Sequence, residues 1–202
     1  MNQLLMVFVK DSSKYPVKTR LKADIGKNKS IWIYNQILKK TVLVLKNINI
    51  DIAVFHYNSI ISKNPFKNFS KWNKVQIGKN LGEKISNAFS WGFEIGYKRI
   101  IVIGSDLWEL NEEIIYKGFF ELNRNRVVIG PSIDGGYYLL GLNKKMPKLF
   151  QGIKWSTKNV LSDTINLLNN DPYILPELND IDTYEDLIAN PSLFKLYNKN
   201  YK

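Results

Sequence analysis

The sequence contains no cysteine and one histidine, and only four of its 29 basic residues are arginine. Without cysteine the chain has no disulfide framework and no thiolate chemistry, which fits a reducing compartment. The apolar run at residues 4–9 is too short for a signal-peptide core and has no basic segment before it. No other apolar run approaches the length of a membrane span. We therefore expect a cytoplasmic protein.

Both common glycine-rich phosphate loops are also missing, GxGxxG as well as GxxxxGK followed by Ser or Thr. Their absence argues against dinucleotide-dependent redox chemistry and against P-loop hydrolysis. The net charge of +11 comes mostly from lysines scattered along the chain. No basic stripe with interleaved aromatic residues is present, so we expect no nucleic-acid partner. A basic surface would still attract a small anionic substrate.

The 202 residues are 45% hydrophobic and predict one domain over residues 1–202, with a polar, aromatic and loosely packed peripheral tail at 191–202. Strands alternate with helices as far as residue 122, and strands then cluster. This order predicts a three-layer α/β fold with a mainly parallel sheet and an antiparallel addition. The expected strands are 4–9, 51–57, 75–77, 100–104, 127–130, 137–141 and 172–175. The expected helices are 21–25, 30–46 with Ser30 as its N-cap, 81–96, 112–122, 156–168 and 183–190.

Four carboxylates fall at the predicted strand ends: Asp106, Asp134, Asp180 and Asp182. The carboxyl ends of parallel strands meet at one edge of a sheet, where α/β proteins bind ligands. Carboxylates that meet there repel one another unless a cation or a proton lies between them. Mg²⁺ usually takes one or two protein carboxylates together with phosphate oxygens, and Asp106 and Asp182 are the best candidates. The alternative is helix capping, by Asp106 near residue 111 and by Asp180 and Asp182 before the 183–190 helix.

The polar loop at 10–20 follows the first predicted strand, and its Lys10, Lys18 and Arg20 could surround a phosphate. The alternative is a solvent-exposed basic loop. In the turn that begins at Asp134, two glycines, Gly135 and Gly136, permit a left-handed backbone and close approach of a ligand. Asp-Gly is equally a common hairpin turn.

The single histidine, His56, lies in a predicted strand. We expect it to be a half-buried structural residue rather than a catalytic base.

Several motifs occur in a fixed order and cover residues 3 to about 190, nearly the whole chain. They are residues 8–10 (FVK), 17–21 (VKTRL), 81–83 (LGE), 104–106 (GSD), 130–131 (GP), 134–138 (DGGYY) with Gly141, 155–157 (WST), and 180–183 (DIDT) with 185–187 (EDL). Together they resemble a bacterial family of nucleotide-diphospho-sugar transferase-like proteins, also described as glycosyltransferases of arsenosugar biosynthesis. More distantly the chain is similar to small nucleotidyltransferases that guanylylate phospholactate or molybdopterin.

The resemblance implies a GT-A-type nucleotide-binding fold and a divalent cation, Mg²⁺ or Mn²⁺. Within it, the candidate metal ligands are Asp106, Asp182 and Asp180, and the candidate catalytic residues are Asp106 and Asp134. The candidate nucleotide or phosphate ligands are Lys10, Lys18, Arg20, Ser105, Gly135 and Gly136.

The chain departs from the family pattern at three places. Ser12 stands where the family usually has proline, Tyr15 where it has glycine, and Leu107-Trp108 where a Cys-Pro or similar pair is common. Tyr15 cannot adopt the backbone conformations open to glycine, so we expect a reshaped phosphate loop. Trp108 is expected to alter what fits beside Asp106.

The leading hypothesis is a metal-dependent transferase that uses a nucleotide-diphosphate sugar and a small-molecule acceptor. The second is nucleotidyl transfer from an NTP to a phosphorylated small molecule, with release of pyrophosphate. The third is a nucleotide-binding module that has lost catalysis. The nucleotide base, sugar, acceptor, stereochemical outcome and oligomeric state stay open.

Overall fold

The strands form one mixed sheet in a computed structural model that describes residues 2–168 and 171–201. Within these residues the sheet has seven strands in the order β3-β2-β1-β4-β6-β5-β7. Strand β6 runs antiparallel to both of its neighbours, β4 and β5, and the other pairs are parallel. The strands are β1 (Gln3–Val9), β2 (Asp51–His56), β3 (Trp72–Val75), β4 (Arg99–Ile103), β5 (Val127–Pro131), β6 (Tyr137–Leu142) and β7 (Tyr173–Ile174).

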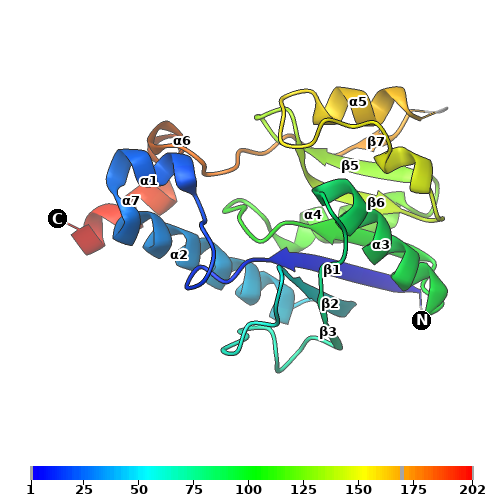
Figure 1. The fold of residues 1–202 in the computed structure, drawn as a ribbon, viewed down its shortest axis with the longest axis horizontal. Helices are drawn as coiled ribbons and strands as arrows, with labels where there is room; N and C mark the ends of the chain where they lie inside the picture. The colour runs from blue at the N-terminus through cyan, green and yellow to red at the C-terminus, as the bar shows by residue number, and fades with distance from the viewer. Residues whose placement is uncertain (1, 169–170, 202) are drawn as a thin grey trace.

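Helices cover both faces of the sheet, which confirms the predicted three-layer α/β fold (Figure 1). Helices α2 and α4 pack on one face, and α3, the 3₁₀ helix η1 and α5 pack on the other. None of the helices in the described part of the chain has the length and apolar character needed to cross a membrane. The helices are α1 (Thr19–Ile25), α2 (Lys27–Lys46), α3 (Leu81–Glu94), α4 (Glu112–Glu121), η1 (Pro147–Phe150), α5 (Val160–Asn166), α6 (Tyr184–Ala189) and α7 (Pro191–Tyr201).

Strands β1 and β4 lie at the centre and are buried on both faces, as their unbroken apolar runs predict. Along β1, Leu5 and Val7 join the core under α2 and α4, whereas Leu4 and Met6 join the core under α3. Because β1 pairs in parallel with both β2 and β4, the carboxyl ends of the three strands lie at one edge of the sheet. The loops after these strands therefore meet there.

A third apolar cluster lies beyond the sheet and joins α1, the first half of α2, α6 and α7. Figure 1 shows these helices gathered at one end of the molecule. The prediction of a loosely packed tail is wrong for residues 191–201, because they form α7 and bury Leu193 and Tyr197 in this cluster. Lys202 lies outside the described residues. The single domain stays a prediction.

Three predicted boundaries are also wrong, each for a local reason. Helix α2 begins at Lys27, so Ser30 lies inside it and its hydroxyl donates to the carbonyl of Lys27 (2.9 Å). The strand expected at 75–77 is β3, which starts at Trp72 because that ring packs under α3, whereas Ile77 is exposed. Helix α5 begins at Val160 rather than Ser156, whose backbone is left-handed (φ 64°).

His56 lies in a strand, as predicted, but the expected half-burial is wrong, because the residue is fully buried at the end of β2. Its Nδ1 accepts the backbone N–H of Ile61 (3.3 Å), so its Nε2 is left to donate to Oδ1 of Asn73 (3.0 Å). Burial lowers the pKa of His56, although the hydrogen bond to Asn73 opposes the shift.

The lowered pKa of His56 makes stability depend on pH. The unfolded chain takes up a proton near about pH 6.5, and the folded chain resists protonation at that pH. The contribution of His56 is therefore present above that pH and lost as the pH falls through and below it. We expect the free energy of urea unfolding to drop between about pH 7.5 and about pH 5.5. His56→Gln should remove most of this drop, and an unchanged drop in the variant would contradict the assignment.

The burial of α7 can be tested at Leu193, which is fully buried, against Leu196, which is 37% exposed on the same helix. Leu193→Ala should lower the free energy of urea unfolding by about 2–5 kcal/mol, because it leaves a cavity in the third cluster. Leu196→Ala should lower it by less than about 1 kcal/mol. Equal effects of the two substitutions would mean that α7 is not part of a packed core.

Candidate active site

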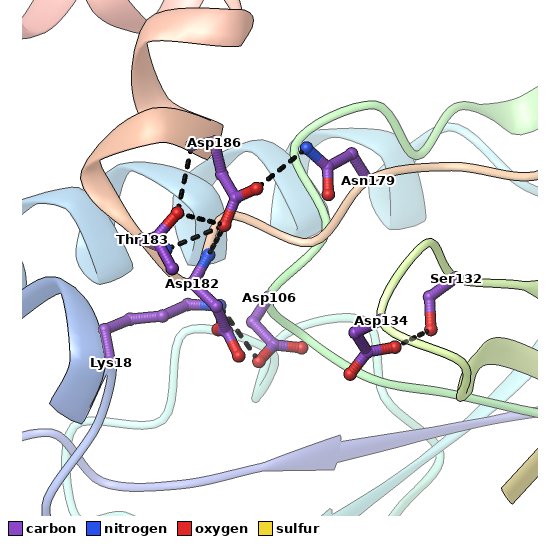
Figure 2. A network of polar contacts seen from close by, with 8 residues as sticks. All are labelled: Lys18, Asp106, Ser132, Asp134, Asn179, Asp182, Thr183 and Asp186. Carbon is purple, nitrogen blue, oxygen red and sulfur yellow. Dashed lines mark hydrogen bonds and ion pairs between the residues drawn. The ribbon is translucent and has the colours of Figure 1, made fainter. Parts of the chain in front are cut away.

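Lys18 lies at the centre of the candidate site, immediately before α1 (Figure 2). Its Nζ is 3.2 Å from Oδ2 of Asp106 and 3.0 Å from Oδ1 of Asp182. The lysine side chain is only 2% exposed, whereas the two aspartate side chains are 47% and 39% exposed. One buried ammonium thus joins two carboxylates that face solvent. The predicted meeting of the basic loop with Asp106 and Asp182 is confirmed.

Neither carboxylate caps a helix, so the capping interpretation of Asp106 and Asp182 is wrong. The cap of α4 is Asn111, whose side chain accepts the N–H of Ile114 (3.0 Å). Helix α6 begins with a capping box between Thr183 and its third residue, Asp186. Asp186 also accepts the backbone N–H of Asp182 (3.0 Å), which fixes the backbone that carries the second carboxylate.

The ion pairs set the protonation states at this centre. Burial alone would lower the pKa of Lys18, but the negative charges of Asp106 and Asp182 outweigh burial and raise it. The charge of Lys18 lowers the pKa of Asp106, against the opposing effect of desolvation. Lys18 is therefore an ammonium and Asp106 a carboxylate at neutral pH.

Asp180 lies beside this pair, and its pKa is shifted in the opposite direction from that of Asp106. Burial raises its pKa to about 8, and the nearby negative charge of Asp106 adds to the shift. Within residues 2–168 and 171–201, no group of three or more His, Cys, Asp or Glu side chains is placed to hold a metal ion. The expected trio of Asp106, Asp182 and Asp180 is thus not assembled as a set, and the two carboxylates that share a cation are Asp106 and Asp182.

The donor chemistry of this pair fits a hard divalent cation. Mg²⁺ usually takes one or two carboxylates from a protein, with phosphate oxygens or water completing its shell. The ammonium of Lys18 already lies between the two, as a stand-in for a cation at that place. The pair is therefore suited to Mg²⁺ or Mn²⁺.

Tyr34 is a buried residue that the sequence pattern does not predict as a site residue, and it contacts both Lys10 and Ser105. The hydroxyl of Tyr34, on α2, donates to the carbonyl of Lys10 (3.0 Å) and lies within hydrogen-bonding reach of the buried Ser105. Lys10 itself is exposed, and its charge helps to lower the pKa of Asp106. In the sequence, the only indication of a role for Tyr34 is its hydroxyl group, which lies on an otherwise apolar helix face.

A cavity of about 580 Å³ lies next to the ion-paired centre and has Arg20, Asp180 and Asp182 in its wall. Phe8, Tyr137 and Trp155 give the cavity aromatic surfaces, and Gly104 lines it at the end of β4. This combination of apolar walls and a few polar groups is typical of small-molecule sites. Lys10, Lys18, Ser105, Asp106 and Gly135 are not among the residues that line the cavity.

The turn between β5 and β6 supplies the opposite wall. Oδ1 of Asp134 accepts both the hydroxyl of Ser132 (2.6 Å) and the backbone N–H of Gly136 (3.0 Å). The segment is a hairpin turn, as its alternative interpretation predicts, and Asp134 and Gly136 also line the cavity. Gly135 has φ 86°, and its carbonyl accepts the N–H of Leu161 (2.9 Å), which ties the turn to α5.

The two unusual residues Tyr15 and Trp108 do not enter the cavity. Tyr15 packs edge-on against Tyr57, and Lys18 rather than Tyr15 carries the left-handed backbone of the loop (φ 47°). Trp108 turns toward the third cluster, and its Nε1 donates to Oγ of Ser192 (2.7 Å). The loop therefore keeps its basic groups at the site although Tyr15 replaces a glycine.

Comparison with known proteins places the chain in a family. A family profile described as "Uncharacterized protein conserved in bacteria (DUF2064)" matches residues 56–157. No curated protein matches the chain. A solved structure named "putative nucleotide-diphospho-sugar transferase" from Desulfovibrio desulfuricans G20 is 27% identical, with a TM-score of 0.82. The match covers 98% of this chain and 99% of that one, and it confirms the resemblance inferred from the motifs.

Two further solved structures share the fold. A 4-diphosphocytidyl-2C-methyl-D-erythritol synthase from Anaerococcus prevotii DSM 20548 is 12% identical, with 96% of each chain covered and a TM-score of 0.62. A manganese complex of Rv0371C from Mycobacterium tuberculosis H37Rv is 9% identical, with 93% of this chain and 96% of that chain covered and a TM-score of 0.57. These two likenesses show that the α/β architecture is shared.

The close packing of the turn can be tested at Gly135. A Cβ at this position would overlap the backbone carbonyl of Lys158, and φ is positive as well. Gly135→Ala should therefore lower the free energy of unfolding by about 2 kcal/mol or more. Gly152→Ala is the matched control, because Gly152 has φ 76° but nothing within 4 Å of an added Cβ. It should cost only about 1 kcal/mol, and equal losses would show that Lys158 does not confine the turn.

Proposed function

The chain belongs to the bacterial family DUF2064, and we propose that it is a metal-dependent transferase that moves a sugar from a nucleotide-diphosphate donor to a small acceptor. The observation that carries the proposal is the cation-linked pair of Asp106 and Asp182, which lies beside a cavity of about 580 Å³. A diphosphate donor needs a concentration of positive charge, and the acceptor needs an adjoining pocket. Both lie at the edge of the sheet where parallel strands end.

Asp106 and Asp182 are the proposed ligands of Mg²⁺ or Mn²⁺. A divalent cation there would neutralise the negative charge that grows on the diphosphate as the sugar–phosphate bond breaks. The manganese complex of Rv0371C, which has the same overall fold, supports the choice of metal. Asp180 lies beside the pair, and burial together with the charge of Asp106 raises its pKa in the absence of a metal ion.

Lys10, Lys18 and Arg20 are the proposed phosphate ligands. Lys10 and Lys18 present their ammonium groups on the side of Asp106, and Arg20 reaches the cavity wall. A guanidinium can bind two phosphate oxygens at once, whereas a lysine supplies a compact charge. Ser105 is placed with them through Tyr34, and its single O–H would turn from Tyr34 to a phosphate oxygen.

The acceptor is proposed to lie in the cavity, between the aromatic walls and Asp134. Both hydrogen bonds to Asp134 within the described chain end on its Oδ1, so Oδ2 is available to an acceptor hydroxyl. Asp134 would then position that hydroxyl and take its proton as the new bond forms. Gly136 supports this geometry because its N–H holds the carboxylate.

The charge of the cavity favours a hydroxyl-bearing acceptor over a phosphorylated one. Its wall contains three acidic residues, Asp134, Asp180 and Asp182, and two basic ones, Arg20 and Lys158, and burial raises the pKa of Asp180 to about 8. The wall therefore has no excess of basic groups to bind a phosphate on the acceptor. Glycosyl transfer is therefore preferred to nucleotidyl transfer onto a phosphorylated molecule, although the Anaerococcus synthase shows that this fold also occurs in a diphosphocytidyl enzyme.

The proposal is tested by incubating the protein and Mg²⁺ with each NTP and with nucleotide-diphosphate sugars, in the presence of a pool of small hydroxyl acceptors or of small phosphorylated acceptors. We expect release of nucleoside diphosphate from a sugar donor. Asp106→Asn should reduce the rate by about 100-fold or more, since it removes charge from the metal pair. Asp171→Asn is the matched control, because Asp171 is exposed and does not line the cavity.

Other outcomes of this assay decide between the alternatives. Release of pyrophosphate from an NTP would replace glycosyl transfer by nucleotidyl transfer. If neither product forms, calorimetry with nucleotides distinguishes an inactive assay from a binding module. Binding that is unaffected by Mg²⁺ and by Asp106→Asn would count against both enzyme functions.

A further inference from the structure

We propose that Lys18 is a tethered cation that competes with the metal ion for Asp106 and Asp182. In the protein without ligands its ammonium fills the place of the metal. The metal binds tightly only when a phosphate group draws the ammonium away, so that nucleotide and metal enter the site as a pair. The inference rests on the metal site of the proposed function, but it concerns binding and is independent of which group is transferred.

The geometry makes the two cations mutually exclusive. Nζ of Lys18 lies 3.2 Å from Asp106 and 3.0 Å from Asp182, so the two carboxylate oxygens flank the same point. A Mg²⁺ ion bound to both carboxylates would need their oxygens at about 2.0–2.1 Å, around this point. An ammonium and a divalent cation cannot share that space.

The two cations would reach this point from opposite sides. The side chain of Lys18 is 2% exposed, so it approaches from the protein interior, whereas Asp106 and Asp182 are 47% and 39% exposed. A metal ion can therefore reach the carboxylates from solvent. It would meet two carboxylates whose charge is already half neutralised by the ammonium from within.

The surrounding structure keeps the ammonium in this position. Lys18 precedes α1, which is anchored by the fully buried Leu21 in the third cluster. Leu187 of α6, the helix that follows Asp182, is buried in the same cluster. The backbone positions that carry Lys18 and Asp182 are thus fixed relative to each other by shared packing. Only the flexible lysine stem can move, and it can move only toward another anion.

Charge balance decides when the exchange occurs. A metal ion added while Lys18 stays in place would bring a double charge close to an ammonium, which costs several kcal/mol at an effective dielectric constant of about 20. A phosphate group supplies the new partner for Lys18 and extra oxygen ligands for the metal. Phosphate and metal therefore strengthen each other's binding, and the coupling is reciprocal.

The competing interpretation is a permanent salt bridge. In that case Lys18 holds α1 against α6 in every state, and the metal binds elsewhere or not at all. The two interpretations predict opposite effects of removing the lysine charge on the binding of metal alone. The measurement therefore needs no nucleotide, acceptor or turnover.

The experiment measures Mn²⁺ binding, without nucleotide, to the whole protein by electron paramagnetic resonance and calorimetry. Wild type should bind Mn²⁺ weakly, and Lys18→Met should bind it at least about tenfold more tightly, because the competing charge is gone. The control is Lys22→Met, which removes an exposed lysine of the same helix and should leave Mn²⁺ affinity unchanged. In a Lys18→Met, Asp182→Asn double variant the gain should disappear. Equal or weaker binding by Lys18→Met would overturn the proposal.

A second variant and a wild-type measurement cover the case in which Lys18→Met does not fold. Lys18→Asn also removes the charge and suits the left-handed backbone at this position (φ 47°). In wild type, the ¹⁵N signal of the Lys18 ammonium should shift when saturating Mg²⁺ and inorganic pyrophosphate are added together, and a signal unchanged at saturation would refute the exchange. Tighter Mn²⁺ binding by the variants together with no transferase activity would retain this inference while the proposed function fails.

Discussion

The site depends on one electrostatic constraint: two carboxylates and a lysine from three distant parts of the chain must neutralise one another at the edge of the sheet. Lys18, Asp106 and Asp182 precede α1, follow β4 and precede α6, respectively. Losing Lys18 would leave two carboxylates without their cation, and losing either carboxylate would leave the buried ammonium with one partner instead of two; both changes are costly. The ion pairs therefore hold the loops around the site as well as preparing it for ligands.

The sheet explains why these distant segments can meet. Parallel pairing of β1 with β2 and β4 brings their ends together. Strand β5 runs in the same direction as β4, because β6 is antiparallel to both, so β5 ends at the same edge and the turn with Asp134 faces the same cavity. The third cluster, built from α1, α2, α6 and α7, adds a second rigid support on the other side. The cavity lies where the ion-paired loops meet this turn, so ligand binding would engage both.

The sequence was sufficient to predict the layers of the fold and the meeting of Asp106 with Asp182 and Lys18, because both follow from strand pattern and from the geometry of parallel strand ends. It was insufficient for features that depend on tertiary packing. Ser30 and Ser156 look like helix caps, yet packing places the helix starts elsewhere. The burial of Lys18 and the part played by Tyr34 depend on neighbours far away in the chain, which no local pattern encodes.

The contact between Trp108 and Ser192 links the loop after β4 to α7 at the far end of the polypeptide. Trp108 lies two residues after Asp106, and its indole N–H bonds to a hydroxyl in the first turn of α7. The loop that carries Asp106 is thereby supported by α7. Truncation before residue 191 would remove this hydrogen bond and the buried side chains of Leu193 and Tyr197. It would thereby disturb the position of Asp106 from a distance.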